Sequence, residues 1–197
     1  RLRSANVMFQ LQRKQEAFAA LRAMQSEAAL DEDARRDAYL LEAELRLKDK
    51  DAAGELDAYA RGLAAFADDA ALLYSRALLW ERRDDIARAE ADFRRILVAA
   101  PDDVNALNAL GYTLADRTTR YREALELIDR ARVAEPGNAA IIDSYGWVLF
   151  RLGKPREALG HDAVDRRCDE EGLDAHVQEP VDGGRGVIRV KRREHHV

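Results

Sequence analysis

Residues 104–136 read VNALNALGYTLADRTTRYREALELIDRARVAEP, and this stretch contains two amphipathic helical patterns followed by a proline. Leu107, Leu110 and Leu114 recur at the spacing of one helical face. Gly111 lies among them, at a point where a second helix must approach closely. The second pattern is marked by Ala124, Ile128 and Ala131. The stretch therefore predicts two antiparallel helices joined by a short turn.

The same pattern recurs along the chain with a nearly constant period. The small residues at the expected helix crossings are spaced by 34, 34 and 35 positions, at Ala43, Ala77, Gly111 and Gly146. The large apolar residues of the second helices keep this spacing, at Tyr59, Phe93 and Ile128. A fixed period of this length is typical of stacked structural repeats. We therefore predict an all-α fold, an α-solenoid built from antiparallel helix pairs.

The period also predicts how the chain is divided. Residues 1–34 fit a partial, degenerate leading repeat, and the solenoid is expected over residues 35–160. Its repeats are expected at about 35–68, 69–102, 103–137 and, incomplete, 138–160.

The periodicity stops at Gly160, because Asp162 and Asp165 occupy positions that should be apolar or small. We expect residues 161–197 to be irregular or disordered, since they offer little apolar surface to offset the entropy of ordering. At most, a short strand is expected at Val187 to Val190.

The composition excludes some classes of function. The net charge of −5 argues against a general nucleic-acid binder, which needs a basic surface. No run approaches the roughly 18 apolar residues of a transmembrane helix. The single cysteine, Cys168, excludes an internal disulfide and leaves the compartment open. Because the chain begins at Arg1 within a helical pattern, we expect a fragment or a processed product.

The repeats resemble tetratricopeptide (TPR) repeats of bacterial type, whose motif pairs a Leu-Gly helix with an Ala-Phe helix before a proline. In the central repeat the motif is met by Leu107, Leu110, Gly111, Leu114, Ala124, Ile128 and Pro136. In its neighbours it is met by Leu73, Ala77, Trp80, Ala89, Phe93 and Pro101, and by Ile142, Tyr145, Gly146, Leu149 and Ala158. Glu42 and Arg76 depart from the apolar Leu position, and Glu55 from the Ala position, so the earlier repeats are degenerate.

The wording of residues 107–159 also resembles TPR proteins of proteobacterial envelopes. These include outer-membrane lipoproteins that act as adaptors for periplasmic carboxyl-terminal processing proteases. The resemblance implies a periplasmic or outer-membrane-associated protein, with the cytoplasm as the alternative. In such relatives the last return helix continues, whereas here it gives way to GHDAVDRRCDEE from Gly160. One hypothesis is that the residues after Gly160 are translated out of frame, and the alternative is natural divergence.

The sequence contains no motif that indicates a catalytic or cofactor-binding site. His161, Asp165, Cys168 and His176 lack the paired spacing of a metal site, so we predict no metal. The DGGRG run at residues 182–186 lacks the strand and helix that flank a phosphate-binding loop. We therefore expect no enzyme and no cofactor.

Binding of another protein or of an extended peptide is the leading hypothesis. In the TPR family the first helix of each pair lines a concave surface, which implies a groove at Tyr74, Leu78, Asn105, Asn108, Tyr112, Asp143 and Trp147. Asn105, Asn108 and Tyr112 share one helical stripe, where amides can pair with a peptide backbone. The Lys and Asn clamp of chaperone-binding TPR proteins has no counterpart at Leu40, Tyr74, Leu78 and Asn108.

Two other interpretations stay open. Tyr74 and Trp147 would instead pack between repeats, with the Asn residues simply solvated. The runner-up function is self-assembly as a homodimer, because the last helix pair lacks a normal capping helix. The face that would associate carries Ile141, Ile142, Tyr145, Leu149 and Leu152.

Overall fold

The computed structural model describes residues 1–159, 173–178 and 187–192. They fall into two compact units, Arg1–Ala99 and Ala100–Val197, which we call the N-terminal and C-terminal units. The all-α solenoid architecture predicted from the sequence is confirmed in the described helical part of the chain.

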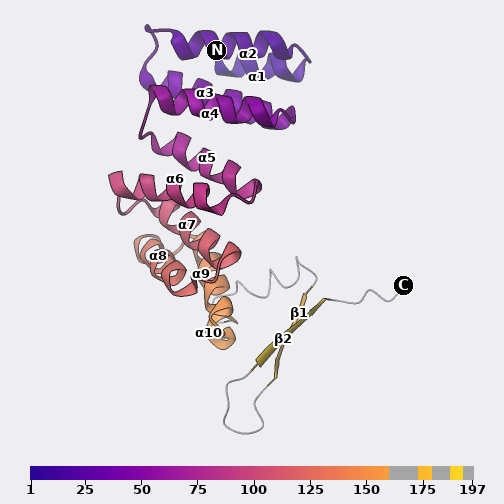
Figure 1. The fold of residues 1–197 in the computed structure, drawn as a ribbon, viewed down its shortest axis with the longest axis vertical. Helices are drawn as coiled ribbons and strands as arrows, with labels where there is room; N and C mark the ends of the chain where they lie inside the picture. The colour runs from indigo at the N-terminus through magenta and orange to yellow at the C-terminus, as the bar shows by residue number, and fades with distance from the viewer. Residues whose placement is uncertain (160–172, 179–186, 193–197) are drawn as a thin grey trace, which may run out of the picture. The chain divides into compact units, whose positions relative to one another are not determined.

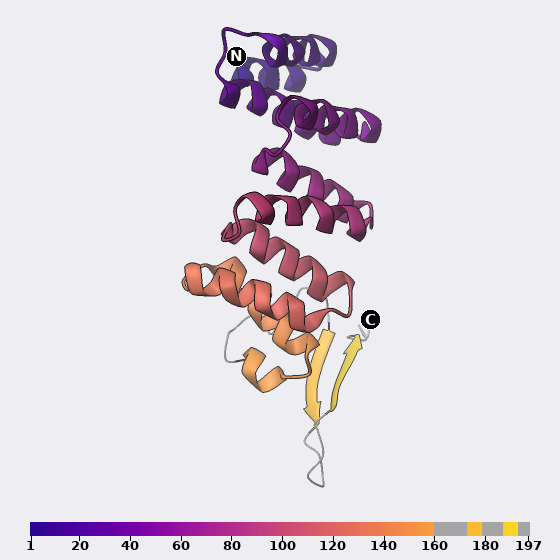
Figure 2. The same cartoon turned by 60° about the vertical axis from the view of Figure 1, so that its left-hand side comes forward.

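The N-terminal unit consists of successive antiparallel helix pairs (Figures 1 and 2). These are α1 (Leu2–Gln10) with α2 (Lys14–Ser26), α3 (Glu32–Lys48) with α4 (Ala52–Ala65), and α5 (Ala70–Arg82) with α6 (Ile86–Ala99). Beyond these pairings, α3 packs against both α1 and α5, so the first helices of the three pairs form a row.

The C-terminal unit repeats the same design. It contains α7 (Val104–Arg117) with α8 (Tyr121–Ala134), and α9 (Ala139–Arg151) with the short α10 (Pro155–Leu159). The first helices α7 and α9 pack against each other. Two strands follow, β1 (Leu173–Gln178) and β2 (Val187–Arg192), which pair antiparallel from Leu173 opposite Arg192 to Gln178 opposite Val187.

The strand expected at Val187 to Val190 therefore lies within β2. The antiparallel pairing with β1 was not predicted, because no second strand was expected within 161–197. Val177, Val187, Ile188 and Val190 are β-branched residues of the kind that favour strands. The remainder of the expected tail, at 161–172, 179–186 and 193–197, lies outside the described residues.

The starts of α3, α4, α5 and α7 follow from acidic residues in the preceding turns. Asp103 accepts a hydrogen bond from the backbone N–H of Ala106 at 2.8 Å, as expected of the residue before a helix. Asp31, Asp51 and Asp69 cap α3, α4 and α5 in the same way. Each such cap satisfies a backbone donor that the helix itself leaves unpaired.

The small residues of the motif lie where paired helices cross. A Cβ atom placed on Gly111 would lie 2.5 Å from Ile128 Cγ1 and 3.0 Å from the backbone oxygen of Ala124. Contacts this short leave no room for a methyl group, so α7 and α8 can approach only because residue 111 is glycine. Ala43 and Ala77, at the equivalent positions of the N-terminal unit, are fully buried.

Candidate functional site

An open groove runs along the row of first helices in the N-terminal unit. Its volume is about 540 Å³, and side chains from α1, α3 and α5 line it together with Tyr59 of α4. The apolar part of the lining is formed by Leu2, Leu40, Leu41, Leu47, Tyr59 and Leu78. The polar part is formed by Arg3, Asn6, Asp37, Glu44, Ser75 and Arg82. We call this feature the α1–α3–α5 groove.

Leu78 and Tyr74, the two sequence-predicted site residues of this unit, lie on α5 in different surroundings. Leu78 is part of the groove lining. Tyr74 packs its ring edge-on against Phe93 of α6, with the ring centroids 5.5 Å apart. Tyr74 therefore packs within its own helix pair, whereas the alternative interpretation of the sequence placed it between repeats.

The groove residues of α1 and α3 were missed as site residues, although the repeat period contains the signal. Stepping back 34 residues from Tyr74 and Leu78 gives Leu40 and Glu44, and both line the groove. A further step of 38 residues, the spacing from Ala43 back to Ala5, gives Leu2 and Asn6. The sequence interpretation centred the site on residues 105–112 because the motif is better preserved there.

Most charged side chains of the groove are already paired. Asp37 bonds Arg36 at 2.9 Å, Glu44 bonds Lys48 at 2.6 Å, and Arg82 forms an ion pair with Glu55. Burial, helped by the nearby Glu55 carboxylate, raises the pKa of Tyr59 to about 12, so its hydroxyl stays protonated at neutral pH. The groove thus combines an apolar lining with hydroxyl, amide and guanidinium groups.

The remaining predicted site residues belong to the C-terminal unit. Asn105 on α7 is exposed, whereas Asn108 and Tyr112 on the same helix are half-buried. The Oδ1 atom of Asn108 is shielded from solvent and accepts no hydrogen bond from the described residues. Any recognition of a peptide by Asn108 in this arrangement would therefore use its amide N–H groups.

Asp143 and Trp147 lie one helical turn apart on α9, which packs against α7. Asp143 is half-buried, and Trp147 is only 9% exposed. The Trp147 ring stacks on Phe150 with centroids 5.6 Å apart, and the Arg151 guanidinium lies 5.5 Å from the indole. Trp147 is thus largely a packing residue, with a small edge left for contact.

The face proposed for self-assembly is accessible only in part. Ile141 is 1% exposed and Leu149 is 2% exposed, while Ile142, Tyr145 and Leu152 are half-buried. Self-association through this face stays a prediction, and only the last three residues could take part in it without rearrangement.

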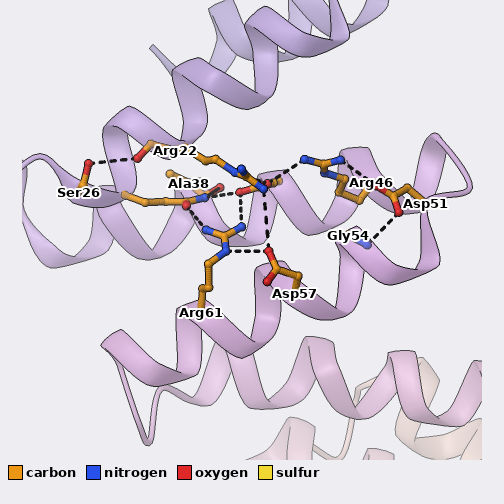
Figure 3. Close-up of polar contacts among 10 residues, drawn as sticks. Arg22, Ser26, Ala38, Arg46, Asp51, Gly54, Asp57 and Arg61 are labelled. Atoms are coloured by element: carbon orange, nitrogen blue, oxygen red, sulfur yellow. Dashed lines mark hydrogen bonds and ion pairs between the residues drawn. The ribbon is translucent and has the colours of Figure 1, made fainter.

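A buried polar network holds the helices of the N-terminal unit together (Figure 3). Its centre is Glu42 of α3, whose side chain is 0% exposed. The carboxylate accepts hydrogen bonds at 2.8 Å from both Arg61 of α4 and Gln25 of α2. Longer bonds of 3.3 Å come from Arg22 of α2 and Arg46 of α3. One carboxylate therefore links three helices from two successive pairs.

The electrostatics of Glu42 follow from these partners. Burial raises its pKa, but the hydrogen bonds from Arg61 and Gln25 and the charges of Arg61 and Arg22 outweigh burial. The net result is a pKa below the ordinary 4.5, so Glu42 is ionised at neutral pH. Outside this centre, Arg46 bonds Asp51 at 2.8 Å, and its guanidinium lies 3.7 Å from the centroid of the Phe18 ring.

The other two departures from the TPR motif are also paired inside the unit. Arg76 of α5 makes two bonds to Asp92 of α6, at 2.8 and 2.7 Å, and Asp92 is 5% exposed. Glu55, which replaces the motif alanine, is 3% exposed and is the partner of Arg82. The charged residues at the degenerate positions are therefore each paired with a residue of opposite charge. A pattern of apolar residues alone does not predict these pairs.

Two other features, a metal site and a membrane-spanning helix, are absent from the described residues. In the part of the chain that the structure describes, no group of three His, Cys, Asp or Glu side chains is arranged to hold a metal ion. None of the described helices is long and apolar enough to cross a membrane. His161, Asp165, Cys168 and the run at 182–186 lie outside the described residues.

Comparison with known proteins places the fold. No family model matches the chain. The chain is 41% identical over 180 residues to the TPR repeat-containing protein PA4667 of Pseudomonas aeruginosa. The match covers 90% of this chain, but the chain spans only 30% of that relative's length.

Several solved structures share the architecture at low sequence identity. PilF of Pseudomonas aeruginosa aligns over 71% of this chain and 63% of its own, with a TM-score of 0.59 and 20% identity. YrrB, described as a TPR protein with an unusual peptide-binding site, aligns over 84% and 81%, with a TM-score of 0.59 and 18% identity. BtubC from P. vanneervenii aligns over 90% and 82%, with a TM-score of 0.67 and 15% identity.

The structural likenesses support the fold, and the 41% identity supports the family. Helix pairs of the expected period are present in both units, with Ala43, Ala77 and Gly111 at helix crossings. The chain belongs to the tetratricopeptide-repeat proteins.

Proposed function

We propose that this chain is a non-catalytic interaction scaffold that holds a segment of another protein, or an extended peptide, against the first helices of its repeats. The observation that carries the proposal is the α1–α3–α5 groove. It is open, it has a volume of about 540 Å³, and leucines from different repeats lie beside unburied polar groups. Sites with an apolar lining and a few placed polar groups are typical of ligand and peptide recognition.

The relatives support this proposal only in general terms. The name of the Pseudomonas aeruginosa relative gives its repeats and no activity. YrrB, which shares the fold, is described as having a peptide-binding site. An extended surface made by consecutive first helices is the part of a solenoid on which binding is expected.

The C-terminal unit offers a second contact surface for the same function. Asn105 and Tyr112 are accessible at least in part on α7, and Asp143 on α9 is half-buried. Amide and hydroxyl groups there can exchange hydrogen bonds with a peptide backbone. The resemblance to protease adaptors implies that the partner is a substrate protein delivered to a protease. We include this partner in the same proposal.

A selection from a displayed random-peptide library with the purified chain tests the function. We expect peptides that bind the parent chain and lose binding to Leu40→Asp and Leu78→Asp variants, because a carboxylate would be placed in the apolar lining. Val98→Asp is the matched control, since Val98 is 85% exposed on α6 and is not part of the groove lining.

A second arm uses Asn108→Ala and Tyr112→Ala in the C-terminal unit. Loss of peptide capture with unchanged thermal unfolding would make them contact residues, and loss of stability would make them packing residues. If no peptide is enriched on the parent chain, or if all the aspartate variants bind as the parent does, the α1–α3–α5 groove is not a binding site.

A further inference from the structure

Arg3 differs from the other charged residues of the α1–α3–α5 groove. Asp37, Glu44 and Arg82 each have an ion-pair partner of opposite charge within the N-terminal unit. The Arg3 side chain, which is exposed on α1, forms no hydrogen bond or ion pair with any described residue. One positive charge is therefore left uncompensated in the groove by the described residues.

Asn6 adds a neutral polar group beside this charge. It lies one helical turn after Arg3 on α1 and lines the same groove. Its amide likewise forms no hydrogen bond with the described residues, so it can both donate and accept. The lining of the groove also includes the apolar side chains of Leu40 and Leu41 on α3 and of Leu78 on α5.

The local charge matters more here than the charge of the whole chain. The net charge of −5 would weakly repel an acidic ligand at a distance. At physiological ionic strength, however, charges in solvent are screened beyond about 8 Å. A carboxylate at Arg3 would meet a guanidinium that no described carboxylate pairs with, whereas Asp37 shares its partner Arg36 with Asp33 and Asp69.

We propose that the groove selects a peptide segment in which an acidic side chain is followed or preceded by apolar residues, with the carboxylate on Arg3. The inference rests on the proposed function, because it names the chemistry of the segment that the groove would hold. Asn6 then bonds the peptide backbone next to the acidic residue, and the leucines receive the apolar side chains. A basic segment is disfavoured, because it would meet Arg3 and would have to displace Arg36 and Lys48 from their partners.

The test repeats the random-peptide selection with the full chain, at about 0.15 M salt, in three forms: parent, Arg3→Glu and Arg122→Glu. Arg122→Glu is the matched control, because it makes the same charge change on an exposed residue of α8 in the C-terminal unit. We expect the parent and the control to enrich Asp or Glu beside apolar residues, and Arg3→Glu to lose that preference or prefer Lys and Arg.

Fluorescence anisotropy then measures the affinity of one selected peptide and of its copy with the acidic residue changed to the amide. An exposed ion pair changes affinity only modestly, so we expect a loss of about two- to fivefold from Arg3→Glu or from the amide peptide. The two changes together should cost less than the product of the single effects. Circular dichroism should show the same helix content in all three forms, since Arg3 has no partner among the described residues.

The outcomes separate the two proposals. Peptides that bind in a leucine-dependent way without acidic enrichment, or with equal affinity for Arg3→Glu, would overturn the role of Arg3 and leave the groove as a binding site. A parent chain that captures no peptide would refute the proposed function, and the acidic preference would fail with it.

Discussion

Removal of the Glu42 carboxylate should strongly destabilise the N-terminal unit, even though a leucine is the usual residue at this motif position. Glu42 is 0% exposed and accepts bonds of 2.8 Å from Arg61 and Gln25. In Glu42→Ala these donors lose their acceptor in a site that solvent does not reach. Breaking a buried ion pair from one side typically costs about 3–5 kcal/mol.

The exposure of the partners places the expected value at the lower end of this range. The side chains of Arg22 and Arg61 are 56% and 33% exposed, so both guanidinium groups can turn toward water. Gln25 keeps a weak bond of 3.3 Å to the backbone oxygen of Ala38. We therefore expect Glu42→Ala to lower the free energy of unfolding by about 3 kcal/mol, and the near-isosteric Glu42→Gln by about 2 kcal/mol.

The matched control removes the three central residues of the network together and leaves Arg46 paired with Asp51. In Gln25→Leu/Glu42→Leu/Arg61→Met no buried charge is left without its partner at the centre, and apolar side chains of similar size fill the space. Such replacements are often neutral or stabilising. We expect this triple variant to lie within about 1 kcal/mol of the parent, and well above Glu42→Ala.

The measurement is urea unfolding followed by tryptophan fluorescence. The chain has two tryptophans, Trp80 in the N-terminal unit and Trp147 in the C-terminal unit. A Trp147→Phe background therefore leaves Trp80 as a reporter of the unit that contains Glu42. This reporter matters, because a chain with two units need not unfold in one step.

The pH dependence gives a second, independent check. The pKa of folded Glu42 is lowered, so its stabilising contribution is complete above the unfolded value near 4.5 and is lost as the pH falls through the folded value. The stability gap between the parent and Glu42→Gln should therefore be constant at neutral pH and shrink below about pH 4.5. A cost below 1 kcal/mol for Glu42→Ala, or a gap that does not change down to pH 3, would refute this reasoning.

Three further predictions concern other contacts. Gly111→Ala should cost about 1–3 kcal/mol in the C-terminal unit, because the new Cβ would lie 2.5 Å from Ile128. Gly137→Ala, with nothing within 4 Å of the new Cβ, should change stability by less than about 0.5 kcal/mol; both are measured by urea unfolding in a Trp80→Phe background, where Trp147 reports on the C-terminal unit. Arg76→Ala and Asp92→Ala should each lower the free energy of unfolding by about 3 kcal/mol, and a double-mutant cycle should show a coupling of about 1–3 kcal/mol. Simple additivity would mean that the two bonds between these residues do not stabilise the unit. Asp103→Ala should lower the free energy of unfolding by about 1 kcal/mol, because the N–H of Ala106 loses its acceptor. Asp103→Asn keeps a side-chain oxygen and should cost much less, so equal losses of stability would contradict the capping role.

The helix pairs could be predicted because their determinants are local. The apolar spacing, the small residue at each crossing and the acidic residue before α3, α4, α5 and α7 all lie within one repeat. Gly111 acts in the structure as its position in the sequence indicates, and Asp103 caps α7. Residues 104–136 contain the apolar spacing and the small residue at the crossing, which is why the period could be read from them.

The buried charges could not be predicted in this way. Glu42, Arg76 and Glu55 interrupt the apolar pattern, and each has a partner that is distant in sequence and lies on another helix. Arg61 is 19 residues after Glu42, and Arg82 is 27 residues after Glu55. A charged residue at a core position gives the same signal whether it is compensated or not, until the neighbouring helices are placed around it.

One of these charges also lies where two walls of the candidate groove meet. Glu42 bonds Gln25 and Arg22 on α2 as well as Arg61 on α4, so it connects the first helix pair with the second. Arg76 and Asp92 connect only α5 with α6. The α1 and α3 walls of the groove belong to the two pairs that Glu42 joins. A carboxylate with directional bonds to α2 and α4 adds geometric specificity to the contact between these pairs. Glu42 therefore links the pair that carries Arg3 and Asn6 with the helix that carries Leu40, at the groove that we propose as the binding site.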